Sequence, residues 1–99
     1  MHARTGRLQV PPESIDDIVG VMKKDQVEMF HGQHGYRGFT GLADRDSGAV
    51  MGISFWNSEE DLRAAEELGR EARRRVAQAG GGQAEPVVER WEVVFDEMV

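Results

Sequence analysis

Apolar and small or polar side chains alternate along the middle of the chain, which predicts two adjacent β-strands. Residues Tyr36–Ala43 and Ala49–Trp56 are rich in β-branched, aromatic and small residues, a composition typical of strands. The segment Asp44–Gly48 between them combines Asp and Ser, which hydrogen bond to the backbone in turns, with a glycine suited to positive φ. The pattern therefore predicts a β-hairpin that turns at Gly48.

The type of turn predicts how the two strands pair. A three-residue bulged loop gives a register in which paired residue numbers sum to about 94. Thr40 then lies opposite Ser54, and Phe39 lies opposite Phe55. One face of the hairpin is apolar, with Phe39, Met51, Ile53 and Phe55, whereas the other carries glycines with Tyr36, Thr40, Ser54 and Trp56. This second face either borders a cavity or packs closely against another element.

Two amphipathic helices flank this hairpin. The first has a buried stripe with helical spacing and one polar break, made of Ile15, Ile18, Val19, Met22, Gln26, Met29 and Phe30. We expect Ser14 to cap it, with Asp17 completing a capping box, and the helix to end near Gly32. The second begins after Ser58 by the same logic and has a narrow stripe of Leu62, Ala65, Leu68, Gly69, Ala72 and Val76. Residues Gly80–Gly82 end it and begin a flexible loop to Pro86.

Strands at the two ends of the chain complete the predicted fold. Arg4–Val10 reads as a strand that Pro11 and Pro12 terminate, and Val87–Phe95 reads as the last strand. The order β-α-β-β-α-β predicts an α+β fold, the ferredoxin-like plait, with a four-stranded antiparallel sheet and both helices on one face. Right-handed crossovers place the first and third strands in the centre.

Length and composition indicate one small domain with a thin core. The chain has 99 residues, 12 of them glycine, and 39% are hydrophobic. Residues 1–99 therefore form a single domain, and dimerisation would increase the surface that it buries. Because no residue is cysteine, disulfides, thiolate nucleophiles and zinc–thiolate sites are excluded.

Charge and hydropathy exclude several classes of partner. The net charge is −6, and the basic cluster of Arg70, Arg73, Arg74 and Arg75 is interleaved with glutamates at helical spacing. We interpret this cluster as a solvated helix face, and we expect no nucleic-acid partner. No stretch has the length of a membrane span or the apolar core of a signal peptide, so we expect a soluble cytoplasmic protein that does not bind membranes.

Three segments of the chain resemble the dimeric α+β barrel superfamily, in particular its antibiotic biosynthesis monooxygenase-like members. His34-Gly35-Tyr36-Arg37-Gly38-Phe39 is similar to the family's entry into its second strand, Pro-Gly-Phe-x-Gly-Phe. Phe55–Leu62 is similar to its aromatic-x-Ser-x-Glu entry into the second helix, and Val88–Val93 is similar to its closing strand. The resemblance covers nearly the whole chain, and its motifs are structural.

The resemblance implies a homodimer whose sheets pack face to face, with a pocket between sheet and helices in each subunit. Relatives use that pocket to oxidise polyketides to quinones or to degrade haem. Haem-degrading members carry a histidine on the second helix and an asparagine on the first strand, and this chain has neither. Quinone-forming members rely on Asn, Trp, Tyr and Arg, residue types that Asn57, Trp56, Tyr36 and Arg90 supply without a position-by-position match.

The candidate ligand-binding residues are those with polar groups on or near the predicted hairpin and its closing strand. Tyr36 and Trp56 each offer an apolar ring with a polar atom and suit either a pocket or the core. His34 is a candidate acid or base at a pocket mouth, and with Glu28 and His31 it is also a weaker metal-site alternative that Gly32 and Gly35 interrupt. The full candidate set is His34, Tyr36, Thr40, Ser54, Trp56 and Arg90, with no metal and no cofactor expected.

Three functions remain open from the sequence. The first is a cofactor-independent monooxygenase-like enzyme that acts on an aromatic or quinone-type small molecule. The second is a non-catalytic dimer of the same fold that binds a small hydrophobic or aromatic ligand or acts in regulation. The third is a structural dimer, which a pocket filled by Met22, Phe30, Phe39 and Phe55 would favour.

Overall fold

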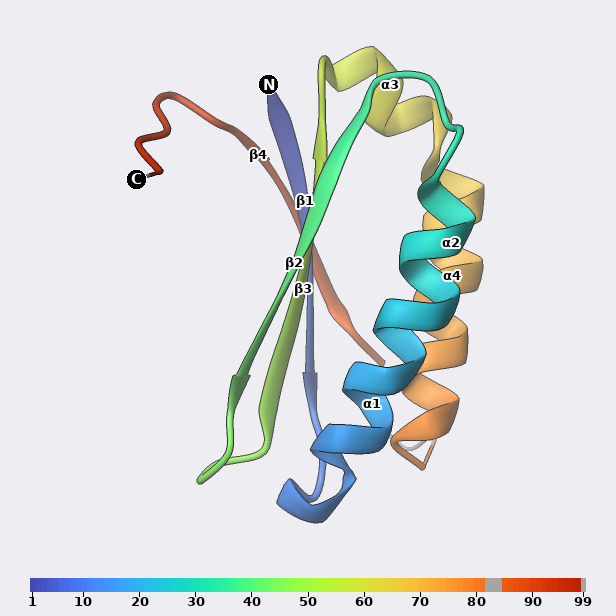
Figure 1. The fold of residues 1–99 in the computed structure, drawn as a ribbon, viewed down its shortest axis with the longest axis vertical. Coiled ribbons are helices and arrows are strands. Elements are labelled where there is room, and N and C mark those ends of the chain that lie inside the picture. The colour runs from blue at the N-terminus through green and yellow to red at the C-terminus, as the bar shows by residue number, and fades with distance from the viewer. Residues whose placement is uncertain (82–84, 99) are drawn as a thin grey trace.

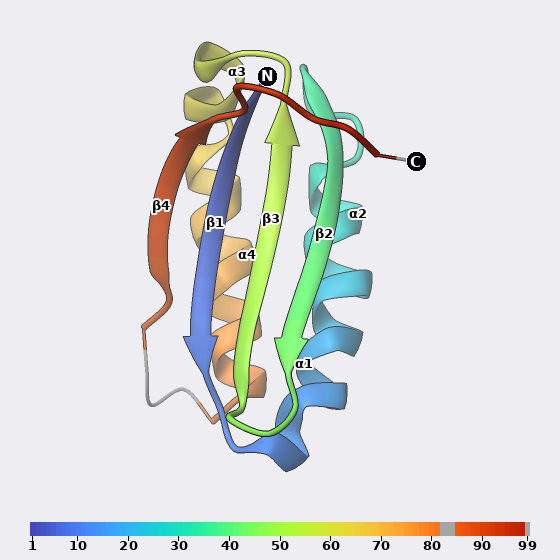
Figure 2. The same cartoon turned by 90° about the vertical axis from the view of Figure 1, so that its left-hand side faces the viewer.

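The computed structural model describes residues 1–81 and 85–98 and confirms the predicted order of elements. In chain order these are β1 (His2–Gln9), η1 (Pro12–Ser14), α1 (Ile15–Val21), η2 (Met22–Gln26), α2 (Val27–Phe30), β2 (Tyr36–Asp44), β3 (Ala49–Trp56), α3 (Glu59–Ala64), α4 (Glu66–Ala79) and β4 (Val87–Glu92). The strands form one antiparallel sheet in the order β2-β3-β1-β4. The helices cover one face of this sheet and leave the other open (Figures 1 and 2).

The first helical run extends from Pro12 to Phe30 and changes its type along the way. A 3₁₀ turn begins it, and a π-helical segment, η2, separates α1 from α2. The predicted Ser14 cap is wrong, because Ser14 already has helical angles and its side chain makes no capping hydrogen bond. The reason is that Pro11 and Pro12 start the turn earlier, since proline suits the first helical positions.

The second helix begins as predicted. The Ser58 hydroxyl accepts a hydrogen bond from the Asp61 backbone N–H at 3.1 Å, and three acidic residues follow in the first turn. The helix is interrupted at Ala65 and resumes as α4, which ends at Ala79 before Gly80. Gly82 and the middle of the predicted loop to Pro86 lie outside the described residues.

The predicted pairing of β2 with β3 is wrong by one residue. Gly48 does take a positive φ of 84°, but residues 45–48 form a four-residue loop and the last pair is Asp44 with Ala49. Phe39 therefore lies opposite Ser54, and Thr40 lies opposite Ile53. Because side chains alternate between faces, a shift of one residue moves every side chain of one strand to the other face relative to its partner.

The corrected register changes which residues face the helices. Val50, Gly52, Ser54 and Trp56 of β3 are buried beneath the helices, whereas Met51, Ile53 and Phe55 lie on the open face. Phe39 packs on the helix side, against the core and against Phe30. The apolar face predicted from Phe39, Met51, Ile53 and Phe55 therefore mixes residues from both faces of the sheet.

Two clusters of buried side chains fill the space between sheet and helices. One lies towards the hairpin turn and contains Leu8, Val10, Ile15, Ile18, Met22, Val50 and Val76. The other lies towards α3 and contains Phe30, Trp56, Leu62, Ala65 and Ala72. Trp56 is the centre of the second cluster, where its ring lies 5.5 Å from the rings of both Phe30 and Tyr36.

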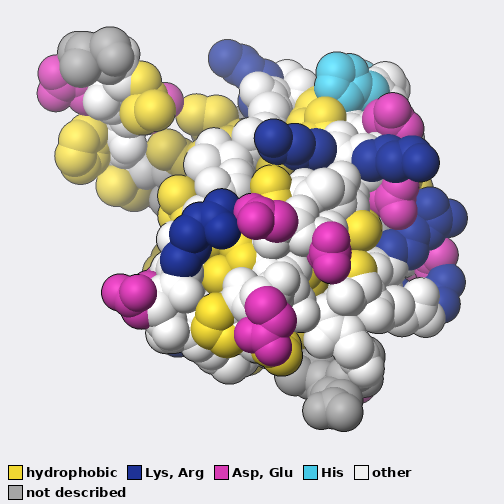
Figure 3. All heavy atoms as spheres, turned by 60° about the horizontal axis from the view of Figure 1, so that its bottom comes forward, with side chains coloured by type: hydrophobic (Ala, Val, Ile, Leu, Met, Phe, Trp, Pro, Cys, Tyr) yellow, Lys and Arg dark blue, Asp and Glu magenta, His cyan; other side chains and the backbone are white. Residues whose placement is uncertain are grey.

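The open face of the sheet and the C-terminal tail expose large apolar side chains. Leu42 and Trp91 are about half exposed on that face, and Val94, Phe95 and Met98 of the tail are almost fully exposed. The tail passes in front of the open face in Figure 2 and stands away from the body of the molecule at the upper left of Figure 3. Acidic and basic side chains intermingle on the face shown in Figure 3.

Candidate functional site

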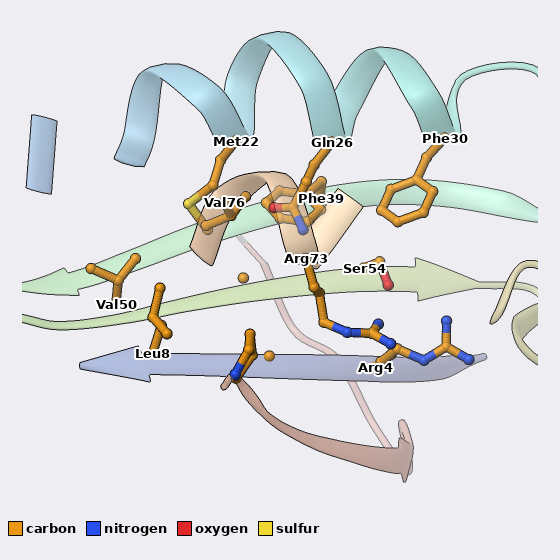
Figure 4. Close-up of a pocket in the computed structure, with 13 residues that line it drawn as sticks. Arg4, Leu8, Met22, Gln26, Phe30, Phe39, Val50, Ser54, Arg73 and Val76 are labelled. Atoms are coloured by element: carbon orange, nitrogen blue, oxygen red, sulfur yellow. The ribbon is translucent and has the colours of Figure 1, made fainter. Parts of the chain in front are cut away.

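A small cavity lies between the sheet and the helices, and Figure 4 shows the residues that line it. It has about 30 Å³ of free space. Its apolar wall is formed by Leu8, Met22, Phe30, Phe39, Val50, Val76 and Pro86, and its polar wall by Arg4, Gln26, Ser54 and Arg73. Gly6 and Gly52 form the floor on β1 and β3.

The floor glycines make room that neighbouring side chains partly occupy. A methyl group on Gly52 would lie 2.7 Å from Cζ of Phe39 and 2.9 Å from Cε of Met22. A methyl group on Gly6 would lie 3.3 Å from Cδ of Arg73. Glycine is therefore needed on the floor because large side chains from β2, η2 and α4 enter the space above it.

The π-helical segment η2 supplies two cavity residues, Met22 and Gln26, which point together towards the sheet in Figure 4. The wider turn of a π-helix is uncommon and is frequently found at functional sites. Gln26 is buried, and its Oε1 atom has no hydrogen-bond partner in the described structure. A buried amide oxygen without a partner costs free energy, so this position suits a ligand that donates a hydrogen bond.

Two arginines and one glutamate form the charged end of the cavity. The Glu66 carboxylate forms ion pairs with Arg4 and with Arg73, the latter at 3.0 Å. Arg4 also donates to the Leu62 carbonyl oxygen at 2.9 Å. Both guanidinium groups lie over Gly69, where an added methyl group would be 3.1 Å from Nη1 of each. Gly69 therefore belongs to the helix stripe because the arginines occupy the space of its side chain.

Arg4 is the most enclosed charge of the site. Burial lowers the pKa of its guanidinium, and the nearby positive charges of Arg73 and Arg90 lower it further, against the opposing effect of Glu66. Its Nε and Nη1 atoms are buried and have no hydrogen-bond partner in the described structure. The site thus holds N–H donors that are available to an anionic or polar oxygen.

Among the candidates from the sequence, Ser54 lines this cavity. Its hydroxyl accepts a hydrogen bond of 2.9 Å from Nε1 of Trp56, which satisfies the indole within the core. Trp56 and Tyr36 pack in the neighbouring aromatic cluster and do not line the cavity. Burial raises the pKa of Tyr36, in keeping with a phenol that faces apolar neighbours.

Thr40, Arg90 and His34 lie away from the cavity. Thr40 is exposed on the edge strand β2, opposite Ile53. Arg90 is exposed on the other edge strand, opposite Arg4. His34 is exposed in the loop before β2, where its Nδ1 lies 2.8 Å from Oδ1 of Asp61. The structure therefore brings one of the six candidates to the cavity.

Two of the three segments that carry the family resemblance, the entries into β2 and into α3, meet at one end of the sheet. His34 pairs with Asp61, and the backbone N–H of Asn57 donates to the Gly35 carbonyl at 2.8 Å. Gly35 has a φ of 79°, and a methyl group there would lie 2.1 Å from Oδ2 of Asp61. Both motifs are needed to build this joint, so their residue types follow from its geometry.

Asp61→Asn is expected to lower the pKa of His34, which the hydrogen bond to Asp61 and its negative charge raise above 6.5. When a histidine has a higher pKa in the folded than in the unfolded protein, its protonation stabilises the fold. This stabilisation is complete at pH values below the unfolded-state pKa and is lost as pH rises through the folded-state pKa. The stability difference between wild type and Asp61→Asn should therefore shrink as pH rises from 6 to 9. An NMR titration of the His34 ring gives the pKa, and urea unfolding at several pH values gives the stabilities.

Asp16→Asn is the control for this titration, because the Asp16 carboxylate pairs with Arg45 at 2.9 Å, and it should leave the pKa of His34 unchanged. An unchanged His34 pKa in Asp61→Asn would show that Asp61 does not hold the imidazolium.

The metal-site alternative finds no support in the described residues. Within residues 1–81 and 85–98, no three His, Asp or Glu side chains are grouped so that they would hold a metal ion. The helix ends at Phe30, and His31 already has extended backbone angles, so Glu28, His31 and His34 do not share a helix face.

Within residues 1–81 and 85–98, no helix is both long and apolar enough to cross a bilayer.

Sequence reasoning missed Arg4, Gln26 and Arg73 as site residues. Arg73 was assigned to the solvated helix face with Arg70, Arg74 and Arg75, and that assignment is wrong for Arg73 alone, which points inward to Glu66. The other three pair with Glu67 or Glu71 at the surface. The available signals were Gln26, a polar residue within an apolar stripe, and Gly69, a gap in the stripe of the second helix.

Comparison with known sequences identifies relatives without a described activity. No family model matches the chain. Two curated proteins of Mycobacterium tuberculosis, the uncharacterized proteins MT2634 (strain CDC 1551) and Rv2557 (strain H37Rv), are each 31% identical over 93 residues. The match covers 94% of this chain and 41% of each relative, so the chain spans about two fifths of their length.

Comparison with solved structures confirms the fold that the motifs indicate. A Streptomyces coelicolor monooxygenase from the gene ActVA-Orf6, in complex with nanaomycin D, aligns with a TM-score of 0.79 at 19% identity over 99% of this chain and 91% of that one. The heme-degrader MhuD of M. tuberculosis aligns with a TM-score of 0.70 at 16% identity, over 99% of this chain and 100% of MhuD. A variant of SnoaB, a cofactor-independent oxygenase of Streptomyces nogalater, aligns with a TM-score of 0.69 at 18% identity, over 96% of this chain and 94% of SnoaB. The chain has the ferredoxin-like fold of the antibiotic biosynthesis monooxygenase-like proteins.

Proposed function

We propose that this protein binds a small hydroxylated aromatic or quinone-type molecule in the cavity and oxidises it with molecular oxygen without a cofactor. The observation that carries the proposal is the buried Oε1 of Gln26, which lacks a partner at the edge of an apolar cavity. A phenolic O–H would satisfy this oxygen while its ring packs against Leu8, Met22 and Phe39. Structural neighbours described as a monooxygenase and a cofactor-independent oxygenase support the reaction class.

The proposed reaction balances with oxygen as the only oxidant. An aromatic CH₂ group is oxidised to a carbonyl, one oxygen atom enters the product and the other leaves as water. The protein's contribution would be to orient the phenol through Gln26 and to exclude bulk water through the apolar wall. None of the described residues that line the cavity has a side-chain pKa ordinarily near neutrality, so the acidity of the substrate itself would supply the reactive anion.

A second candidate is ligand binding without turnover, and the filling of the cavity favours it. Phe39 and Met22 already occupy the space above Gly52, and the free space is about 30 Å³. An aromatic ring enters only if these side chains move. Methionine adapts readily because its side chain is unbranched, and a protein with this arrangement can bind a ligand tightly without catalysing a reaction on it.

Oxygen uptake with an anthrone-type hydroxyaromatic compound separates the two candidates. Val50→Phe fills the cavity and should abolish uptake, while overpacking lowers stability by about 1–3 kcal/mol. The control is Ala43→Phe, the exposed cross-strand partner of Val50, which should leave uptake unchanged. Circular dichroism confirms that both variants fold.

The outcomes of this experiment are distinct. Uptake above buffer that Val50→Phe removes supports the oxygenase. Binding of the compound by calorimetry without uptake supports the second candidate. If the compound neither binds nor drives uptake, or if Val50→Phe retains full activity, the cavity is not the functional site for this class of molecule.

We further propose that the protein is a homodimer that buries the open face of the sheet. Met51, Ile53 and Phe55 lie on that face with Leu42 and Trp91, and the exposed apolar tail extends from the same side. Apolar surface gathered on one face of a small domain favours association. In a dimer with C₂ symmetry, the same face of a second copy would pack against it.

Ile53→Glu is expected to convert the dimer to a monomer of 11.1 kDa in sedimentation at micromolar concentration. A buried, unpaired carboxylate at the interface should weaken association by roughly 100-fold or more. Gln78→Glu adds the same charge at an exposed position of α4 and should leave the dimer intact. A wild-type protein that sediments as a monomer at this concentration contradicts the proposed dimer.

A further inference from the structure

The charged end of the cavity contains more positive than negative charge. The side chains of Arg4 and Arg73 are 2% and 14% exposed, and a single carboxylate, Glu66, 28% exposed, pairs with both. Of the described residues that line the cavity, none is acidic. Two guanidinium groups beside one carboxylate leave one unit of positive charge uncompensated in a poorly solvated place, where a missing counter-charge is costly.

The surroundings of this end do not supply the missing negative charge. Arg90 lies opposite Arg4 on β4 and adds a further positive charge nearby. Glu92 lies opposite His2, one pleat further along the same pair of strands. The carboxylate of Glu59 hydrogen bonds to Arg63 at 2.7 and 3.0 Å. Of these groups, Arg90 is positive and Glu59 bonds to Arg63, and no ion pair joins Glu59 or Glu92 to Arg4 or Arg73 in the described structure.

The site also holds buried donors and acceptors that lack hydrogen-bond partners. Nε and Nη1 of Arg4 are buried donors without partners in the described structure, whereas Oε1 of Gln26 is a buried acceptor without one. Arg4 comes from β1 and its side chain extends along that strand, whereas Gln26 points towards the sheet from the helical layer above it, so the two residues line different sides of the cavity (Figure 4). A ligand that satisfies both must carry an anionic acceptor at one point and a donor at another.

We propose that the ligand is a hydroxylated aromatic carboxylate, whose carboxylate pairs with Arg4 and Arg73 and whose hydroxyl donates to Gln26. The inference rests on the proposed function, because it specifies the ligand of the same cavity. A carboxylate supplies the second counter-charge that the two guanidinium groups lack, and guanidinium binds carboxylate with two parallel hydrogen bonds. The apolar wall of Leu8, Phe39 and Val76 then contacts the ring.

The test compares three probes of similar size at pH 7 by isothermal titration calorimetry. 4-Hydroxybenzoate has the carboxylate and a hydroxyl on the opposite side of the ring, benzoate has only the carboxylate, and 4-hydroxybenzyl alcohol has the phenolic hydroxyl but no charge. We expect wild type to bind 4-hydroxybenzoate roughly 10- to 100-fold more tightly than the neutral alcohol, because hydrogen bonds to charged groups contribute the most. Benzoate should bind with intermediate affinity.

Matched variants assign the preference to residues. Arg4→Met should remove the preference for 4-hydroxybenzoate over the alcohol and remain folded, because Glu66 keeps Arg73 as its partner. Gln26→Leu should remove the preference for 4-hydroxybenzoate over benzoate. Arg70→Met is the control: it removes the same charge from exposed helix α4, where Arg70 pairs with Glu67, and both preferences should persist. If Arg4→Met does not fold, Arg73→Gln provides the same comparison.

Several results would overturn this inference. Equal affinity of wild type for 4-hydroxybenzoate and the alcohol would show that the cavity has no need of an anion. An anion preference that survives in Arg4→Met and Arg73→Gln would place the anion elsewhere, as would loss of that preference in Arg70→Met. Oxygen uptake with neutral hydroxyaromatic compounds, together with no binding of any acid, would overturn the carboxylate while leaving the proposed function intact.

Discussion

Trp56→Ala is expected to lower the free energy of unfolding by about 3–5 kcal/mol, the range for removing a buried Trp or Phe side chain. Trp56 is 0% exposed and joins β3 to the helices through edge-on contact with Phe30 at 5.5 Å and contact with Tyr36. The substitution also removes the indole N–H that donates to Ser54. A domain of this size has a total stability of about 5–15 kcal/mol, so the variant should lie close to unfolding. Urea denaturation followed by circular dichroism measures the loss.

Trp91→Ala is the matched control for Trp56→Ala. Trp91 is 53% exposed on the open face of the sheet, where its Nε1 donates to the Thr5 hydroxyl at 3.3 Å. Its loss should cost about 1 kcal/mol or less in dilute protein, where the monomer dominates. If the open face is a dimer interface, the cost should grow with protein concentration. Equal losses for the two tryptophans in dilute protein would contradict the role of Trp56 as the centre of the core.

Gly48→Ala is expected to destabilise the protein by about 3 kcal/mol, through backbone strain and a steric clash together. The φ of Gly48 is +84°, and an added methyl group would lie 1.9 Å from the Val10 carbonyl oxygen. That oxygen belongs to the backbone and cannot move aside alone. The Val10 N–H donates to the Gly48 carbonyl at 2.9 Å, so a shift of the turn also breaks the contact that joins the hairpin to the end of β1.

Gly32→Ala separates strain from the clash in this prediction. Gly32 has a nearly identical φ of +85°, but nothing lies within 4 Å of an added methyl group. Its substitution should cost about 1 kcal/mol, the strain of a left-handed conformation alone. Thermal unfolding of both variants measures the difference. A loss for Gly48→Ala no larger than that for Gly32→Ala would mean that the turn relaxes away from Val10 at no cost.

The cavity shows why the site was harder to predict than the fold. Arg4 is one of several polar residues in the first strand, and Arg73 belongs to a run of arginines of which three do face solvent. Arg73 differs from these neighbours by one local signal, the Gly69 that lies four residues before it. It turns inward because Gly69 on its own helix and Gly6 on β1 leave space for its side chain, and these two glycines meet only in the folded chain.

The error in the hairpin register has a similar origin. The turn residues predict a bulged three-residue loop and a positive φ at Gly48; the positive φ is confirmed, and the loop length is wrong. The choice between a three- and a four-residue loop depends on packing against Val10, which comes from β1. That choice moved Phe39 to the helix side and placed Thr40 on the open face.

The sequence by itself determined the order of elements, the buried stripes of both helices, the Ser58 cap and the one-sided sheet. These features follow from periodicity and local hydrogen bonding, which act over a few residues. Only the tertiary structure decided the strand register, the π-helical turn, and the meeting of Arg4, Glu66 and Arg73 with Gln26 around one cavity. Those features depend on contacts between residues far apart in the chain. At the cavity the physical reason is that Gly6, Gly52 and Gly69 leave space, which side chains from other elements fill.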